Sequence, residues 1–411
     1  MKILWVSSFF PYPPDNGAKI REFFLIRELA EKHDISVFSL VQSADELDGS
    51  EPLQKICQNV TGVLPENKLP NLLDGRRRWY DVPMGILFPH PKFMYGRPSM
   101  NVVRQLHAEL SSGKYDVVIV ESLVTVNYLW DFLHLPNKPI MILSELNIES
   151  LIQEQTLRHA RGVIQKLRKW IYYHSFVRFE KQTCQLFNKI IVVSEKDYVD
   201  IQTLFPSLKA ERLILAPNGV DIQWNDIGNI PKEENTLIYN GALTYSANYD
   251  AIYYFLNEIF PLIIKQIPDV KLKITGKTDG VDINSLPHYQ NVLFTGYVPD
   301  IRPVVKSSMV CVVPIQVGGG TRLKILEAMA LGTPVVSTSK GAEGLHLEHG
   351  KDLLIADSPE DFANAVILVM RDRKLQNQLM ENALQTVSSL YSWNGIAKQL
   401  ELAITSLYQS N

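Results

Sequence analysis

The chain has 411 residues, of which 46% are apolar and 21% are charged, so it can build two domains with large buried cores and does not have a disordered composition. Its formal net charge of −3, from 41 Lys and Arg against 44 Asp and Glu, argues against nucleic-acid binding, which usually requires a basic domain. The three cysteines share no short spacing, so neither a disulfide framework nor a zinc site is indicated. Together with the lack of any window of about 18 apolar residues, this predicts a cytoplasmic protein.

The first half of the chain alternates short apolar runs with helical patterns. Runs typical of strands buried on both faces occupy residues 3–6, 35–40, 115–120, 140–143 and 189–193. A helical pattern over 20–33 separates the first two runs, and a strand, helix and strand in that order form a right-handed unit with parallel strands. Segment 45–110 is less regular and receives no assignment.

A second series of strands follows a break at Pro217-Asn-Gly-Val-Asp221, whose Pro and Asn-Gly indicate a tight turn. Its apolar runs occupy residues 236–240, 270–275, 292–295, 310–313 and 334–337. We therefore predict the α/β fold class, with two Rossmann-like, doubly wound parallel-sheet domains that face a cleft. The expected domains are 1–216 and 217–385, and we expect the final helix, about 386–411, to pack back on the first of them.

The most informative loop joins the strand ending near Val313 to a helix. It contains Gly318, Gly319, Gly320 and Thr321, followed by Arg322 and Lys324. Bare backbone amides, a helix N-terminus and two cations suit a diphosphate, and cations in a first helical turn oppose the helix dipole. The alternative is a solvated helix start with ordinary surface charges.

Two other positions are candidates for contact with a ligand. Glu327 lies one helical turn beyond Lys324, where a carboxylate can accept hydrogen bonds from both ribose hydroxyls or instead form a salt bridge. Gly17 follows the first strand, where a glycine allows the backbone to approach a ligand or simply turns the chain.

Several motifs together resemble the group 1, family-four retaining glycosyltransferases of the GT-B fold. The motifs are Leu323-Lys-Ile-Leu-Glu-Ala-Met-Ala-Leu-Gly-Thr-Pro-Val-Val-Ser-Thr338, Gly341-Ala-Glu-Gly344, Gly296-Tyr-Val-Pro-Asp300 and the turn at 217–221. The resemblance covers nearly the whole chain and is strongest over about 290–345. It implies a donor nucleoside diphosphate sugar on the C-terminal domain and a saccharide or lipid-linked acceptor facing the N-terminal domain.

The resemblance also implies a role for each donor-site position. Glu327 would bind ribose, the glycine run with Thr321 would offer amides to the diphosphate, and Gly17 would lie near the reacting phosphate. Tyr297 and Val298 would lie near the base. The implied setting is the biosynthesis of a bacterial surface polysaccharide or glycolipid.

The chain departs from the family pattern at three places. Gly319 stands where the first glutamate of a paired-glutamate motif would be, and Leu146 stands where a histidine near the sugar is expected. Ala242 and Ala247 stand where many members have an Arg and a Lys that hold the diphosphate. We hypothesise that the positive charge has moved to Arg322 and Lys324.

Two carboxylates at predicted strand ends, Glu121 and Glu145, are the catalytic candidates. They could orient the acceptor or stabilise a developing oxocarbenium ion, or they could be surface carboxylates. No Asp-x-Asp motif occurs, so we predict no metal site and no cofactor beyond the nucleotide-sugar substrate.

Residues 158–181 are basic and rich in aromatic side chains, with Glu180 as the one acid. Such a helix can lie on anionic lipid headgroups, or it can pack its aromatic side on the first domain with a solvated basic face. Two other functions stay open: a nucleotide-sugar epimerase of the same fold, and a non-catalytic nucleotide-sugar-binding partner.

Overall fold

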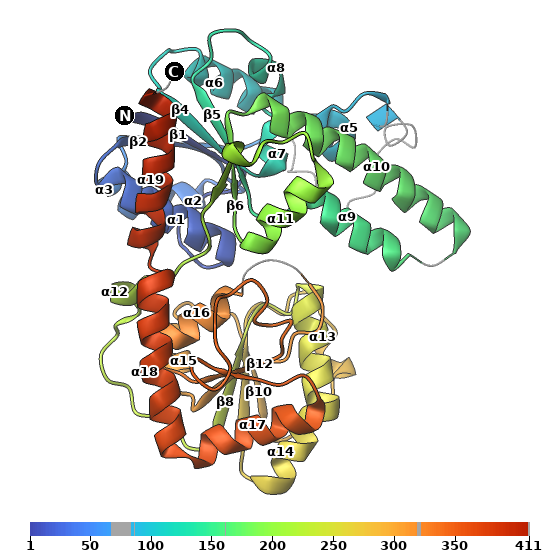
Figure 1. Ribbon diagram of the computed structural model, residues 1–411, viewed down its shortest axis with the longest axis vertical. Coiled ribbons are helices and arrows are strands. Elements are labelled where there is room, and N and C mark those ends of the chain that lie inside the picture. The colour runs from blue at the N-terminus through green and yellow to red at the C-terminus, as the bar shows by residue number, and fades with distance from the viewer. Residues whose placement is uncertain (67–83, 86, 161, 319–321, 410–411) are drawn as a thin grey trace. The chain divides into compact units, whose positions relative to one another are not determined.

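The computed structural model describes residues 1–66, 84–85, 87–160, 162–318 and 322–409 (Figure 1). The chain divides into two compact units. The first unit is Met1–Pro217 together with Ala397–Asn411, and the second is Asn218–Ile396.

The first unit is built on a parallel sheet of seven strands in the order β3-β2-β1-β4-β5-β6-β7. The strands are β1 (Lys2–Ser7), β2 (Asp34–Leu40), β3 (Asn59–Val63), β4 (Val117–Glu121), β5 (Ile140–Glu145), β6 (Lys189–Val192) and β7 (Leu213–Leu215). The strand order reverses between β1 and β4, which pair with Ile3 opposite Val117. The loops that follow these two strands therefore lead to opposite faces of the sheet. The crevice between them, at the carboxyl ends of β1 and β4, is where ligands of such sheets bind.

The helices of the first unit surround this sheet (Figure 1). They are α1 (Gly17–Ala30), α2 (Asp45–Asp48), α3 (Glu51–Ile56), α5 (Pro91–Tyr95), α6 (Met100–Leu110), α7 (Ser122–Val126), α8 (Trp130–Leu133), α9 (Glu149–Arg158), α10 (Val163–Leu186), α11 (Glu195–Leu204) and the short η1 (Ala210–Arg212). Helix α1 begins where Asn16 accepts a hydrogen bond from the N–H of Lys19 at 3.2 Å, and it buries Phe23, Phe24 and Ile26. Among its described residues, the segment that received no assignment from sequence thus contains α2, α3, α5, α6 and β3.

The second unit repeats this topology with six parallel strands in the order β10-β9-β8-β11-β12-β13. The strands are β8 (Thr236–Asn240), β9 (Lys271–Thr275), β10 (Val292–Gly296), β11 (Val310–Val313), β12 (Val335–Ser337) and β13 (Leu354–Ile355). The helices are α12 (Ile222–Asn225), α13 (Ser246–Tyr254), η2 (Phe255–Ile259), α14 (Phe260–Gln266), η3 (Ile283–Ser285), α15 (Arg302–Ser307), α16 (Leu323–Ala330), α17 (Pro359–Arg371) and α18 (Arg373–Leu390). The predicted fold class, α/β with doubly wound parallel sheets, is confirmed.

The C-terminal segment is shared between the two units. Val387 and Tyr391 are buried in the core of the second unit, so the chain returns to the first unit at Ala397 rather than at residue 386. Beyond that point, α19 (Trp393–Gln409) is tied to the first unit by an ion pair between Lys32 and Glu401 at 2.7 Å. Within the described part of the chain, every helix is too short or too polar to span a bilayer.

Lys232 connects three segments of the second unit. Its ammonium group donates hydrogen bonds to the carbonyl oxygens of Ser308 at 2.9 Å and Gly332 at 3.0 Å, and to the hydroxyl of Thr333 at 3.1 Å. These acceptors lie just before β11 and just before β12. Burial lowers the pKa of Lys232 to about 8, so the group is largely protonated at neutral pH and holds both loops.

We predict that Lys232→Met destabilises the second unit by about 2 kcal/mol or more, because three hydrogen bonds from a charged donor are lost and their acceptors stay partly buried. Differential scanning calorimetry of the whole chain measures this as a lower transition temperature. Lys265→Met, at an exposed position of α14 in the same unit, is the matched control and should leave the transition in place. Equal transitions for the two variants would contradict the anchoring role.

Candidate functional site

The strongest candidate site lies in the second unit, where the strand order reverses between β8 and β11. Ligands of open α/β sheets bind outside the carboxyl ends of strands at such a point. Three segments start there: the loop after Asn240, the loop after Val313, and the N-terminus of α16.

Lys324, in the first turn of α16, is held in place by residues that follow β8 or belong to it. Its ammonium group lies 4.0 Å from the ring centroid of Tyr239 and 3.1 Å from Oδ1 of Asn248. The same Oδ1 accepts a hydrogen bond from the Tyr239 hydroxyl at 2.7 Å, and the Asn248 amide donates to the carbonyl of Ala242 at 2.8 Å. A cation over an aromatic face with a fixed amide acceptor has little freedom to move.

Small residues make room for the two cations. A Cβ atom on Gly241 would lie 2.6 Å from the Lys324 ammonium, so any side chain there would displace it. Gly318 has φ of +111°, a conformation that favours glycine, and a Cβ atom there would lie 3.2 Å both from Cβ of Ala247 and from Nη2 of Arg322. The guanidinium of Arg322 and the ammonium of Lys324 therefore occupy the space beside the two small residues at 242 and 247.

Burial shifts the pKa of three groups at this site: Lys324 and Glu327 on α16, and Arg322 directly before it. Burial lowers the pKa of Lys324 to about 7, and the charge of Arg322 acts in the same direction. Burial raises the pKa of Glu327 to about 7, while Lys324 opposes this shift. Arg322 is 9% exposed, and burial lowers its pKa from its ordinary value. Because burial disfavours the charged forms, an anion arriving between these cations would stabilise them.

Tyr297 and Val298 directly follow β10, on the same carboxyl edge of the second sheet. Tyr297 is exposed, and the ammonium of Lys277 lies 5.5 Å from its ring centroid. The loops after β9 and β10 are joined by a hydrogen bond from the N–H of Gly276 to the carbonyl of Gly296 at 2.9 Å. An exposed aromatic face beside a cation is thus presented at this edge. Of the expected donor-site residues, Gly319, Gly320 and Thr321 lie outside the described residues.

In the first unit, Gly17 is the exposed first residue of α1, after the loop that follows β1. The two predicted catalytic carboxylates end neighbouring strands, Glu121 on β4 and Glu145 on β5, and they are 0% and 2% exposed. Neither is a surface carboxylate. In this structure both side chains lie among protein groups rather than in solvent.

Glu121 belongs to a buried polar cluster around the start of α1. Burial raises its pKa to about 7, and the charge of Arg21 opposes that rise. Glu22 has its pKa raised further, by burial and by Glu121, although it accepts a hydrogen bond from the Ser7 hydroxyl at 3.0 Å. Arg21 also donates to the carbonyl of Pro217 at 3.0 Å. The two carboxyl groups and one guanidinium cannot all be charged at low cost, so the carboxyl pair retains a proton near neutral pH.

Glu145 belongs to a second group of buried carboxylates. Burial raises its pKa well above the ordinary value, and Glu180, Glu149 and Glu121 add to the shift. Glu180, whose pKa burial raises to about 7, accepts hydrogen bonds from the N–H groups of Glu149 and Ser150, both at 2.9 Å, at the start of α9. Sequence reasoning assigned no role to Glu22 or Glu180. The one signal for Glu180 was its position as a lone acid in a basic stretch.

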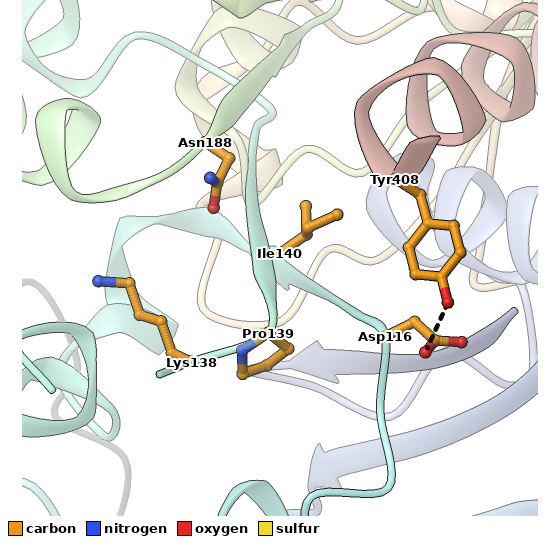
Figure 2. Close-up of a pocket in the computed structure, with 6 residues that line it drawn as sticks. All are labelled: Asp116, Lys138, Pro139, Ile140, Asn188 and Tyr408. Atoms are coloured by element: carbon orange, nitrogen blue, oxygen red, sulfur yellow. Dashed lines mark hydrogen bonds between the residues drawn. The ribbon is translucent and has the colours of Figure 1, made fainter. Parts of the chain in front are cut away.

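A hollow of about 520 Å³ lies at the opposite edge of the first sheet (Figure 2). It is lined by Asp116, Lys138, Pro139, Ile140, Asn188 and Tyr408, near the amino ends of β4, β5 and β6. Its polar groups already serve the fold, because Asp116 accepts from the N–H of Lys2 at 2.7 Å and Asn188 accepts from that of Met141 at 2.9 Å. This edge is opposite the carboxyl ends of the strands, where ligands of such sheets bind, so the hollow is not a candidate active site. Among the described residues, no cluster of three or more His, Cys, Asp or Glu could hold a metal ion.

Comparison with known proteins finds a family match within the second unit and relatives over the whole chain. Residues 234–372, within the second unit, match the family model described as glycosyl transferases group 1. An uncharacterized 44.6 kDa protein in the cps region of Klebsiella pneumoniae is 23% identical over 406 residues, which are 95% of this chain and 96% of that protein.

Solved structures share the fold over the whole chain. A sucrose-phosphate synthase from Thermosynechococcus elongatus has a TM-score of 0.70 at 17% identity and covers 100% of both chains. The Anabaena protein HepE, in complex with UDP and glucose, has a TM-score of 0.65 at 14% identity and covers 99% of this chain and 100% of its own. The family match over the second unit and the shared fold together support a group 1 glycosyltransferase with the GT-B fold.

Proposed function

We propose that this protein is a retaining, metal-independent hexosyltransferase that uses a nucleoside diphosphate sugar. The acceptor in this proposal is a saccharide or a lipid-linked saccharide, in the biosynthesis of a surface polysaccharide or glycolipid. The observation that carries the proposal is the pair of cations, Arg322 and Lys324, at the point where the strand order of the second sheet reverses. Such a pair can neutralise a diphosphate with the protein's own charge.

The positions of small residues support the idea that the diphosphate-binding charge has moved. Ala242 and Ala247 cannot contribute charge, but the cations of α16 reach the space beside them. Charge-assisted hydrogen bonds to phosphate contribute roughly 1.5–3 kcal/mol each. Two such contacts therefore supply a large part of the binding free energy of a ligand with micromolar affinity.

The proposal assigns the other parts of the donor to residues of the second unit and to Gly17 of the first. In the proposal, Glu327 binds the ribose hydroxyls, one helical turn beyond Lys324, and the loop of Gly318, Gly319, Gly320 and Thr321 offers amides to the diphosphate. Tyr297 and Val298 lie near the base, and Gly17 approaches the reacting phosphate. Because the structural neighbour HepE was solved with UDP, uridine nucleotides are the first to test.

The proposed chemistry relies on positioning and charge rather than on a histidine base. The departing diphosphate takes the acceptor's proton, and Arg322 and Lys324 stabilise the negative charge that develops on it. Glu121 and Glu145 take part on the acceptor side. Burial raises the pKa of both and so favours their neutral forms, and the proposal therefore gives them the role of orienting neighbouring groups.

The proposal extends to a cytoplasmic protein that contacts an anionic membrane peripherally through the exposed side chains of residues 158–181. This contact would bring a lipid-linked acceptor to the enzyme. The basic character of the segment and its exposed apolar side chains support it.

We predict that Lys324→Met and Arg322→Met each raise the dissociation constant for UDP and for inorganic pyrophosphate by more than about tenfold, because each removes a charge-assisted contact. Glu327→Gln should weaken UDP but leave pyrophosphate unchanged, because its partner is the ribose. Isothermal titration calorimetry in EDTA measures both ligands. Lys265→Met removes an exposed charge of the same unit and should bind as the wild type does. Unchanged constants for Lys324→Met and Arg322→Met would refute the moved-charge hypothesis.

We predict that sugar release from the best-bound donor proceeds at the same rate in EDTA and in added magnesium or manganese, because protein cations hold the diphosphate. The released or transferred sugar should keep its anomeric configuration, as followed by proton NMR. Loss of activity in EDTA would contradict metal independence. A sugar that changes configuration without release of nucleotide would indicate an epimerase, and binding without turnover would indicate a non-catalytic partner.

We predict that the protein loses stability between pH 5 and pH 8, because of its buried carboxyl groups. In the folded protein the pKa of Glu121, Glu149 and Glu180 is about 7, against an ordinary value of 4.5. Their contribution to the free energy of unfolding is therefore fully present below pH 4.5 and is lost as the pH rises through about 7. The transition temperature should fall by at least about 3 °C across this range. Glu145→Gln, which fixes a neutral side chain, should show a smaller fall, and an equal fall would contradict a neutral Glu145.

A further inference from the structure

Helix α10 (Val163–Leu186) has two halves with different surroundings. In its second half, six side chains are buried in the first unit: Ser175, Phe176, Phe179, Glu180, Thr183 and Cys184. In its first half, residues 163–168 and 170 are exposed. The aromatic rings of the second half pack into the core, as the packing alternative for residues 158–181 predicts, so a membrane contact is left to the first half.

The first half exposes four large apolar side chains, which we name the apolar stripe. They are Val163, Ile164, Leu167 and Trp170, with exposed fractions of 84%, 78%, 57% and 49%. Single exposed apolar residues are common on protein surfaces, but four within two helical turns make a contiguous patch.

The apolar stripe is not an extension of the surface that packs on the core. At about 100° per residue, its four side chains fall within a sector of the helix about 120° wide. The six buried side chains of the second half centre on a direction about 180° from that sector. Packing against the first unit therefore cannot explain why these positions are apolar.

Positive charges border the apolar stripe on both sides. At the same angular spacing, Lys166 lies about 40° beyond one border and Arg168 about 40° beyond the other. Both are exposed, and the sequence has no acidic residue from 155 to 179. Cations flanking an apolar face can reach headgroup phosphates while the apolar side chains enter the acyl boundary.

The apolar stripe also lies at an accessible end of the first unit. Helices α9 and α10 lie side by side and extend away from the sheet of that unit, with the stripe near the turn that joins them (Figure 1). A narrow end of a helical hairpin can enter a bilayer surface without moving the sheet.

We propose that the apolar stripe inserts into the interfacial layer of an anionic membrane, with Lys166 and Arg168 on the lipid phosphates. This inference deepens the proposed peripheral contact and rests on it. A bilayer is favoured over a protein groove because cations border the stripe on both sides, as a uniformly anionic surface requires.

The test is flotation of the full-length protein with vesicles of phosphatidylcholine alone or mixed with phosphatidylglycerol. Ile164→Asp with Leu167→Asp should reduce binding to the mixed vesicles at least about tenfold, because insertion of two apolar side chains is lost. Lys166→Gln with Arg168→Gln should reduce binding and its dependence on salt. Val199→Asp with Leu402→Asp alters positions of the same unit that are 59% and 70% exposed, and should bind as the wild type does.

The possible results separate insertion, surface contact and transferase function. Equal binding of the wild type and the Ile164→Asp, Leu167→Asp variant would overturn insertion, and the Lys166→Gln, Arg168→Gln variant would then report whether surface contact remains. No binding of the wild type to either vesicle would overturn both membrane claims. Self-association that this aspartate variant abolishes, without vesicle binding, would assign the stripe to a second copy of the chain. UDP titration of the same preparations judges the transferase proposal separately, and Lys324→Met should still float with the vesicles.

Discussion

The ammonium group of Lys324 lies between the ring of Tyr239 and the side-chain oxygen of Asn248. Much of the second unit's carboxyl edge is arranged around this contact. Tyr239 belongs to β8, and Asn248 belongs to α13 and is fixed to the backbone of Ala242. The absent side chain of Gly241 leaves the space that the ammonium fills. A single cation therefore joins a strand, a loop and two helix starts at the point where a ligand of this fold is expected.

The two sheets share one topology but use the reversal point differently. In the second unit that edge carries cations beside small residues and an exposed aromatic ring. In the first unit it carries buried carboxyl groups, with Arg21 as their charged neighbour. Burying several acids costs free energy unless they bind protons, and burial accordingly raises the pKa of Glu22 and of Glu121. The likeness of the two folds thus says little about the chemistry of each edge.

Sequence patterns were sufficient for the fold class, because strands buried on both faces are continuous apolar runs that can be recognised locally. They also selected Arg322 and Lys324, since cations in a first helical turn are unusual. They could not reveal that Asn248 holds Lys324, or that Glu22 lies against Glu121, because these contacts join elements that are distant in the chain. The pattern over 158–181 left membrane contact and packing on the first unit both open for a similar reason. One helix carries two apolar faces on opposite sides, and only tertiary packing shows which of them is buried.

The lowered pKa of Lys324, about 7, has a consequence for how this site fills. Around neutral pH the unoccupied site carries a mixture of the protonated and neutral amine. A bound diphosphate would restore the ordinary basicity of that amine, so occupancy and proton uptake become a single coupled event. The release of a diphosphate after transfer would then return that proton to solvent. In the proposed transferase, the protonation of this one side chain would then link the pH to donor binding and to diphosphate release.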